Sequence, residues 1–324
     1  MTAGGFVDIQ VNGWRGVDFS SPSLAVEDVL RVADHLAECG TAAYLPTVTT
    51  SPPEVYEKAL PVIAEAKEKS GGRILGVHLE GPFISREDGA VGAHPKACVQ
   101  APSPEALDVL LDYAPGLVKL ITIAPEMPGA LDLIRRAVKA GVTVSIGHSL
   151  AKAGDVKAAA DAGATLVTHF GNGCPNMVPR HDNFFWPVLA EERLKCLMIS
   201  DGHHTPPALL KTVLLAKGVA GMTATSDMSA AAGLPVGEYT TLGTRVRVEA
   251  SGRISNLNAP TLAGSSADML TCLNHLAELK LAGEADLWRL GRDNPLAAIG
   301  LTAAALPKAG YRPHRFDGIR FVPA

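Results

Sequence analysis

Short apolar runs alternate with amphipathic segments along nearly the whole chain. Several of the runs are continuous in Val, Ile, Leu and Ala, which is typical of strands buried on both faces. The amphipathic segments 23–40, 51–71, 149–163 and 205–218 each begin at Ser or Thr and end at Gly, the usual start and stop signals of a helix. The predicted strands are 6–13, 41–50, 73–81, 118–126, 142–148, 165–170, 196–202 and 221–227.

Eight strands, each followed by a helix, predict a (β/α)8 TIM barrel, with a doubly wound open sheet as the competing layout. The barrel is favoured because polar residues end nearly every strand, and a barrel brings all strand ends to one face. We predict one barrel domain over residues 1–324, with a β-hairpin insertion at about 236–257 and a short tail, 309–324. The polar strand ends are Gln10, Asn12, Thr47, Thr49, Glu80, Glu126, His148, His169, Asp201, His203, His204 and Asp227.

Composition and charge argue against several kinds of binding partner and site. With 324 residues, 47% of them hydrophobic, the chain can bury a sizeable core. A net charge of -4 without a dense Lys/Arg run argues against a nucleic-acid partner, and no uncharged apolar run is long enough to cross a membrane. The N-terminus lacks the features of a signal peptide, so we expect a cytoplasmic protein. The five cysteines are scattered without a CxxC pair, which argues against disulfides or a cysteine-based zinc site.

Glu80, His148 and His169 form the sharpest candidate site. A glutamate at the end of a buried strand needs a partner, which could be a basic side chain or a cation. A lone strand-end histidine is usually a hydrogen-bonded core residue, but His148 and His169 end consecutive strands and should lie side by side. One glutamate and two histidines are a common ligand set of catalytic zinc, with a position left open for water. The set therefore predicts a metal site.

Other polar residues leave alternatives open. Asp227 could be a turn cap or the general base beside a metal site. His203 and His204 are adjacent, and on an extended stretch only one of them would face the pocket. Cys174 follows His169 and could be a nucleophile, but no third, orienting group is evident, which favours a buried, inert thiol.

The motifs HLEGPF, GAH (92–94), SIGHS, THFGNGCP, ISDGHH, TSDMSAAAGLP and LAGSS occur in this order, after GFVDIQVNGWRGVDF near the N-terminus. Together they resemble the N-acetylglucosamine-6-phosphate deacetylase family of the amidohydrolase superfamily. The resemblance implies a TIM barrel of the metal-dependent hydrolase type that cleaves an acetamide. It also implies a small β-sandwich built from both chain ends, which we expect to be missing or reduced here.

The resemblance assigns roles to single residues. Glu80, His148 and His169 match the ligands of one divalent metal ion, for which we predict Zn²⁺ with Fe²⁺ as the alternative. Asp227 matches the catalytic acid and base, and His204 matches a histidine that polarises the acetamide carbonyl and orients the substrate. Gln10-x-Asn12 stands where many amidohydrolases carry His-x-His. The matches to substrate-binding residues are Ala93, His94, Asn172, Gly173, Arg180, His204, Leu262, Ala263 and Gly264.

Two further details of the resemblance concern the oligomeric state and the substrate. The residue at Arg180 is supplied by the other subunit in the family, which implies a homodimer. The family usually reads Asn-Ala-Met where this chain has Asn172-Gly173-Cys174, and segment 179–183 also departs from the usual pattern. The favoured reaction is deacetylation of N-acetylglucosamine 6-phosphate. The alternatives are an amidohydrolase of another N-acylated sugar or a cyclic amide, and an inactive sugar-phosphate-binding protein.

Overall fold

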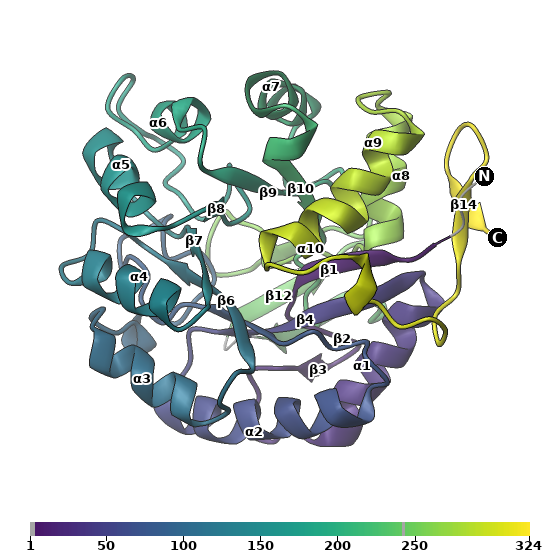
Figure 1. Ribbon diagram of the computed structural model, residues 1–324, viewed down its shortest axis with the longest axis horizontal. Helices are drawn as coiled ribbons and strands as arrows, with labels where there is room; N and C mark the ends of the chain where they lie inside the picture. The colour runs from purple at the N-terminus through teal and green to yellow at the C-terminus, as the bar shows by residue number, and fades with distance from the viewer. Residues whose placement is uncertain (1–3, 242–243) are drawn as a thin grey trace.

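Eight parallel strands form a nearly closed barrel in the computed structural model, which describes residues 4–241 and 244–324. The strands follow each other in the sheet in chain order, and a parallel bridge between Val11 and Met228 links its two edges. Figure 1 shows the strands inside a ring of helices. The predicted (β/α)8 barrel is confirmed, and the open sheet is wrong. The barrel strands are β1 (Phe6–Val11), β4 (Thr41–Thr49), β5 (Val77–Glu80), β6 (Val118–Ile123), β7 (Thr143–Ile146), β8 (Leu166–Val167), β9 (Lys195–Ile199) and β10 (Met222–Thr225).

The helices end where the sequence predicts but begin differently. Gly163 and Gly218 form the C-caps of α5 and α7 with positive φ, as expected for glycine. The predicted Ser and Thr starts are wrong, because these residues lie outside the helices. Instead, α2 and α7 begin with prolines, whose fixed φ suits a first turn. The helices are α1 (Val26–Glu38), α2 (Pro53–Lys69), α3 (Pro104–Asp112), α4 (Ala130–Lys139), α5 (Ala153–Ala162), α6 (Phe185–Ala190), α7 (Pro207–Lys217), α8 (Met269–Glu278), α9 (Glu284–Trp288) and α10 (Asn294–Ala298).

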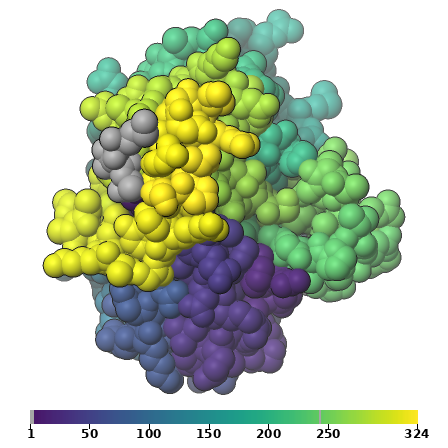
Figure 2. All heavy atoms as spheres, turned by 90° about the vertical axis from the view of Figure 1, so that its right-hand side faces the viewer, coloured from purple at the N-terminus to yellow at the C-terminus, as the bar shows by residue number. Residues whose placement is uncertain are grey.

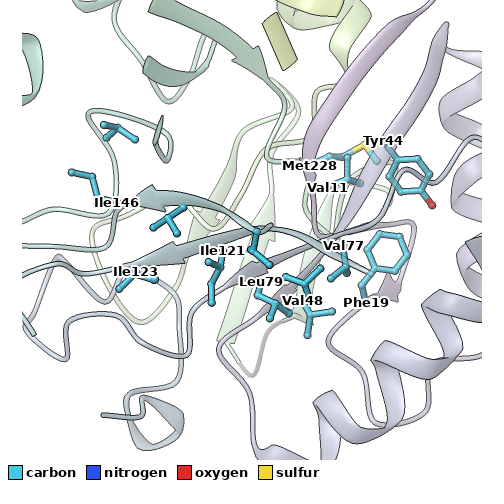
Figure 3. Packing of buried hydrophobic residues seen from close by; sticks show 14 of the residues in the cluster. Val11, Phe19, Tyr44, Val48, Val77, Leu79, Ile121, Ile123, Ile146 and Met228 are labelled. Carbon is cyan, nitrogen blue, oxygen red and sulfur yellow. The ribbon is translucent and has the colours of Figure 1, made fainter. Parts of the chain in front are cut away.

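Strand alternation sorts the barrel side chains into two sets. On β5 and β6, Val77, Leu79, Ile121 and Ile123 pack outward against the helices, in the large apolar cluster of Figure 3. The residues between them point into the barrel. Because both faces are buried, the strands read as continuous apolar runs in the sequence.

The barrel interior changes from apolar to polar toward the carboxyl ends of the strands. A separate apolar cluster fills one end and includes Ile9, Leu45 and Leu120. The next residue that alternation turns inward on β6 is Thr122, whose hydroxyl lies 2.8 Å from His78 Nε2 and 2.7 Å from Thr168 Oγ1. This hydrogen-bonded layer supports the mouth of the barrel, where Glu80 follows His78 on the same face of β5.

Asp8 closes the barrel between its first and last strands. Its carboxylate is fully buried and accepts hydrogen bonds from the hydroxyls of Thr225 (2.8 Å) and Ser226 and from the backbone N–H of Gln10 (3.2 Å). Burial outweighs these bonds and raises the pKa of Asp8 to about 6. The β1–β10 contact therefore includes a side chain that titrates in the mildly acidic range.

Three small sheets accompany the barrel. Strands β2 (Gly13–Trp14) and β3 (Val17–Asp18) form a short hairpin. The predicted insertion is a three-stranded antiparallel sheet of β11 (Gly237–Thr241), β12 (Thr244–Val248) and β13 (Ile254–Asn256), so it has one strand more than the predicted hairpin. Figure 2 shows the green segment that contains this insertion protruding from one side of the molecule.

The tail pairs with itself and with the start of the chain. Strands β14 (His314–Phe316) and β15 (Phe321–Pro323) are antiparallel, and Gly4 forms a bridge with His314. The N- and C-terminal segments consequently lie side by side (Figure 1). Within the described residues, no helix combines the length and the apolar character needed to span a membrane.

Candidate active site

A cavity of about 470 Å³ opens at the carboxyl ends of the barrel strands. Its floor contains the predicted metal ligands, and its walls come from the loops that follow the strands and from the inserted sheet. A pocket in this position is where TIM-barrel enzymes bind substrates. The lining residues used below are Asn12, Thr49, Glu80, Ala93, His94, His148, His169, Asn172, Gly173, Cys174, His203, His204, Asp227, Arg253, Leu262 and Gly264.

Glu80, His148 and His169 converge on one point of the floor. Glu80 Oε1 lies 3.0 Å from His148 Nε2 and 2.9 Å from His169 Nε2, and the two nitrogens are 3.1 Å apart. All three side chains are buried, and their ligand atoms lie within 4.8 Å of one another. The structure thus brings the predicted ligand set together.

The donor set suits a divalent cation. His148 Nδ1 lies 2.7 Å from the carbonyl oxygen of Ala90, so that nitrogen carries a proton and Nε2 presents a lone pair to Glu80. Two lone pairs 3.0 Å apart require a proton or a cation between them. Although burial raises the pKa of Glu80, its contacts with His148 and His169 hold that pKa well below the ordinary value. An ionised carboxylate and two imidazoles are ligands that Zn²⁺ and Fe²⁺ both accept.

Three residues that follow barrel strands and line the cavity have an unusual backbone conformation. His148, His169 and Asp227 follow β7, β8 and β10, and their φ angles are 51°, 28° and 52°. Residues other than glycine rarely adopt this left-handed region, which costs about 1–3 kcal/mol each and persists at functional sites. Glu80 needs no such turn, because it ends β5 on the inward face.

Two amide side chains, one near the end of β1 and one directly after it, hold the two carboxylates of the floor. Gln10 Nε2 donates to Glu80 Oε1 at 2.9 Å, and Asn12 Nδ2 donates to Asp227 Oδ1 at 2.8 Å. Gln10 and Asn12 are both buried. Amides at these positions orient the carboxylates, and the metal candidate is the single Glu/His/His set found among the described residues.

Asp227 lies at the floor without belonging to the ligand set. Burial is the main reason that its pKa is raised to about 7, and the charge of Glu80 adds to the effect. The nearby His169 and His204 and the hydrogen bond from Asn12 act in the opposite direction. A carboxyl group with a pKa near neutrality can both accept and release a proton, which a general acid and base must do.

His204 is fixed by Asp201. Its Nδ1 lies 2.7 Å from Asp201 Oδ2, which also accepts a hydrogen bond of 2.8 Å from Ser265 Oγ. Burial raises the pKa of Asp201, but the hydrogen bonds and charge interaction with His204, together with the backbone hydrogen bond from His203, hold that pKa below its ordinary value. Asp201 therefore orients the ring and leaves Nε2 for the cavity.

The expectation that only one of His203 and His204 faces the pocket is wrong. Both line the cavity, because they lie in a turn after β9 rather than on an extended stretch. The turn is closed by Asp201 Oδ1, which accepts from the backbone N–H of both residues at 2.9 Å. His203 Nε2 in turn lies 3.2 Å from the carbonyl oxygen of Ser251 in the inserted sheet.

The structure separates the residues that resemble substrate ligands into two groups. Six of them line the cavity beside His204, whereas two do not. Ala263 is buried in the small apolar cluster beneath the inserted sheet, and Arg180 is exposed outside the cavity. The six are Ala93, His94, Asn172, Gly173, Leu262 and Gly264.

Gly173 leaves room for the imidazole rings. It has a φ of 58°, and a Cβ at this position would lie 3.0 Å from both His148 Nδ1 and His169 Cε1. Cys174 also lines the cavity, but its Sγ contacts only the carbonyl oxygen of Gly171, at 3.8 Å, among the hydrogen bonds of the described chain. Because burial raises the pKa of this thiol, the inert reading of Cys174 is favoured over a nucleophile.

The sequence did not predict the observed positions of two further residues, Arg253 and Glu126. Arg253, in the turn between β12 and β13, lines the cavity, and no pattern in the sequence singles it out from the other arginines of that segment. Glu126, one of the polar strand ends, does not line the cavity. It accepts hydrogen bonds of 2.6 Å from Ser149 Oγ and the backbone N–H of Leu150, and so supports the loop after His148.

Comparison with known proteins gives the family of this chain. No family model matches it. The human N-acetylglucosamine-6-phosphate deacetylase is 40% identical over 295 residues, covering 85% of this chain and 69% of that protein. The N-acetylgalactosamine-6-phosphate deacetylase of Escherichia coli O157:H7 is 30% identical over 298 residues, covering 91% and 77%.

A solved structure agrees with these relatives. The N-acetyl-D-glucosamine-6-phosphate deacetylase of Mycobacterium smegmatis, solved as a variant in complex with N-acetyl-D-glucosamine-6-phosphate, superimposes with a TM-score of 0.88 at 28% identity. The match covers 98% of this chain and 84% of that one. With the barrel, the strand-end ligand set and these relatives in agreement, the chain belongs to the N-acetylglucosamine-6-phosphate deacetylase family.

Proposed function

We propose that this protein hydrolyses the acetamide of N-acetylglucosamine 6-phosphate and releases acetate and the amino sugar phosphate. The observation that carries the proposal is the arrangement of the cavity floor. The candidate metal ligands Glu80, His148 and His169 lie there together, and the carboxyl group of Asp227 lines the same cavity without belonging to the ligand set. Family membership and the substrate names of the relatives support the same reaction.

The cofactor in this proposal is one divalent metal ion held by Glu80, His148 and His169. We favour Zn²⁺, with Fe²⁺ as the alternative. When bound, such an ion polarises the acetamide carbonyl and lowers the pKa of a water molecule. Gln10 keeps Glu80 in place through its hydrogen bond to Oε1.

The chain's own residues then move the protons. Asp227, held by Asn12, accepts a proton from the attacking water and later gives it to the departing amine nitrogen. His204, oriented by Asp201, directs Nε2 toward the acetamide carbonyl oxygen, where it helps to polarise the carbonyl and to orient the substrate. The raised pKa of Asp227 suits both directions of transfer.

The proposal includes a homodimer in which Arg180 enters the cavity of the second subunit. Arg180 is exposed outside its own cavity, and large apolar side chains surround it in the sequence: Met177 is 90% exposed and Trp186 is 56% exposed. Exposed apolar side chains near a charged residue are typical of a protein interface. Mixing inactive Asp227→Asn and Arg180→Ala subunits should restore activity, and a mixture without activity would contradict this arrangement.

A second candidate substrate is N-acetylgalactosamine 6-phosphate, which the Escherichia coli relative favours by its name. Acetate release from both hexosamine phosphates and from their unphosphorylated forms tests the two candidates together. We expect the highest kcat/KM with N-acetylglucosamine 6-phosphate. A higher value with the galactose isomer would favour the second candidate, and no acetate from any of them with metal bound would favour a binding protein.

A further inference from the structure

The cavity has an acidic floor and a single basic side chain at its rim. Glu80 and Asp227 lie at the floor, whereas Arg253 is the one lysine or arginine among the described residues that line the cavity. A sugar phosphate whose acetamide lies over the floor needs a cation at the other end of the cavity. We propose that Arg253 recognises the phosphate group of the substrate within its own subunit, an inference that rests on the proposed function.

The backbone of Arg253 is anchored to the barrel. Its carbonyl oxygen accepts from the backbone N–H of Glu249 at 2.9 Å, which closes the turn between β12 and β13. Ser251 O in this turn lies 3.2 Å from His203 Nε2, and Gly252 O accepts from Ser266 Oγ. The turn is thus held against both the loop after β9 and the segment before α8, so Arg253 extends from a fixed position at the rim.

The guanidinium of Arg253 is available for an anion. Arg245 and Arg247 on the same sheet are paired with Glu238, at 2.8 and 2.6 Å. The closest acidic neighbour in sequence, Glu249, instead accepts a hydrogen bond from Ser255 Oγ. Within the described residues, no carboxylate forms an ion pair with Arg253. A free guanidinium can bind phosphate oxygens through two parallel hydrogen bonds, which a lysine cannot reproduce.

The position of Arg253 also indicates which property of the enzyme its loss should change. Arg253 belongs to the turn between β12 and β13, outside the barrel strands and strand ends that carry Asp227 and the metal ligands. Its loss removes a contact to the phosphate end of the substrate and leaves the reacting groups of the floor in place. The expected effect is therefore on the preference for phosphorylated over unphosphorylated substrate.

The test compares Arg253→Ala, Arg253→Lys and the control Arg247→Ala, which removes an arginine of the same sheet that is paired with Glu238. The measured quantity is the ratio of kcat/KM for N-acetylglucosamine 6-phosphate to that for N-acetylglucosamine. We expect this ratio to fall about tenfold to a hundredfold in Arg253→Ala, because a hydrogen bond to a charged group is lost. It should fall less in Arg253→Lys and stay unchanged in Arg247→Ala. An unchanged ratio in Arg253→Ala would overturn the proposal.

Subunit mixing separates Arg253 from Arg180. If Arg253 serves its own cavity, mixing Arg253→Ala with Asp227→Asn subunits gives no site with both groups intact, and the ratio stays low. Recovery of the wild-type ratio in that mixture would contradict a role within one subunit.

Equilibrium binding keeps the test independent of catalysis. If the wild type releases no acetate, the proposed function fails, but glucosamine 6-phosphate should still bind more weakly to metal-loaded Arg253→Ala than to the wild type. Equal binding to the two proteins would overturn the role of Arg253 whether or not the protein hydrolyses an acetamide.

Discussion

Asp227 differs from its neighbours because it is the carboxyl group of the floor that stands outside the ligand set. Its hydrogen bond from Asn12 fixes its position, and its pKa near 7 leaves a proton that can move. Glu80, by contrast, is held ionised by two histidines. At the scale of single residues, the environment thus gives two carboxyl groups of one cavity different tasks.

Replacing Asp227 with Asn should lower kcat by about 10²–10⁴, because the amide cannot transfer the proton. Metal content, measured by atomic emission on the purified protein, should stay at the wild-type value. Turnover at the wild-type rate would remove Asp227 from the mechanism, and loss of the metal would instead assign it to the ligand set.

Replacing Asp201 with Asn should act through His204. The amide cannot hold the Nδ1 proton as the carboxylate does, so we expect a loss of about 10- to 100-fold in kcat with little change in KM. Ser265→Ala removes a neutral hydrogen bond to the same Oδ2 atom and serves as the graded control, with a smaller loss. Steady-state kinetics measures both variants, and a change confined to KM would contradict a positioning role.

At the scale of elements, the barrel depends on how β1 meets β10. A parallel bridge between Val11 and Met228 supplements the hydrogen bonds that Asp8 receives from Thr225 and Ser226. The closure of the sheet therefore relies on a buried carboxyl group as well as on backbone pairing.

This closure should make stability depend on pH. Because the pKa of Asp8 is raised from 3.8 to about 6 in the folded protein, the folded state binds the proton more tightly than the unfolded state. The resulting stabilisation is present below pH 4 and is lost as the pH rises through 6, a change of about 3 kcal/mol. Urea unfolding of the wild type and of Asp8→Asn between pH 4 and 7 checks this. The difference between them should move in favour of the variant as the pH rises, and a constant difference would contradict the assignment.

The strand pattern could be predicted because both faces of these strands are buried. Each of the eight predicted strands overlaps an observed one, and the polar residue at its carboxyl end identifies the mouth. Helix starts could not be predicted from Ser alone. In α1 and α5 the cap residues are Ala25 and Lys152 instead of the expected Ser, and their backbone N–H groups donate to the carboxylates of Asp28 and Asp155 inside the helices.

At the scale of the whole molecule, the parts that escaped prediction are contacts between distant segments. The ligands Glu80, His148 and His169 could be predicted because strand order alone brings them together. Arg253 could not, since its place at the rim depends on how the inserted sheet packs against His203 and Ser266. The adjacent histidines show the same limit, because a turn closed by Asp201 replaced the expected extended stretch.

Metal binding should stabilise the whole barrel, because β5, β7 and β8 each position one ligand. A ligand that binds only the folded state at 100 times its Kd contributes about 2.7 kcal/mol. Thermal unfolding should therefore occur several degrees higher after Zn²⁺ is added to chelator-treated protein. Glu80→Gln should abolish this shift, whereas Glu126→Gln, outside the cavity, should keep it. A shift that survives in Glu80→Gln would place the metal elsewhere.

The central claim is a single metal-dependent centre for acetamide hydrolysis, and metal titration of the chelator-treated protein tests it most directly. Acetate release from N-acetylglucosamine 6-phosphate should be absent without metal and should rise linearly to a plateau at one equivalent of Zn²⁺ or Fe²⁺ per chain. Full activity without added metal, or a plateau at two equivalents, would contradict a single centre built from Glu80, His148 and His169.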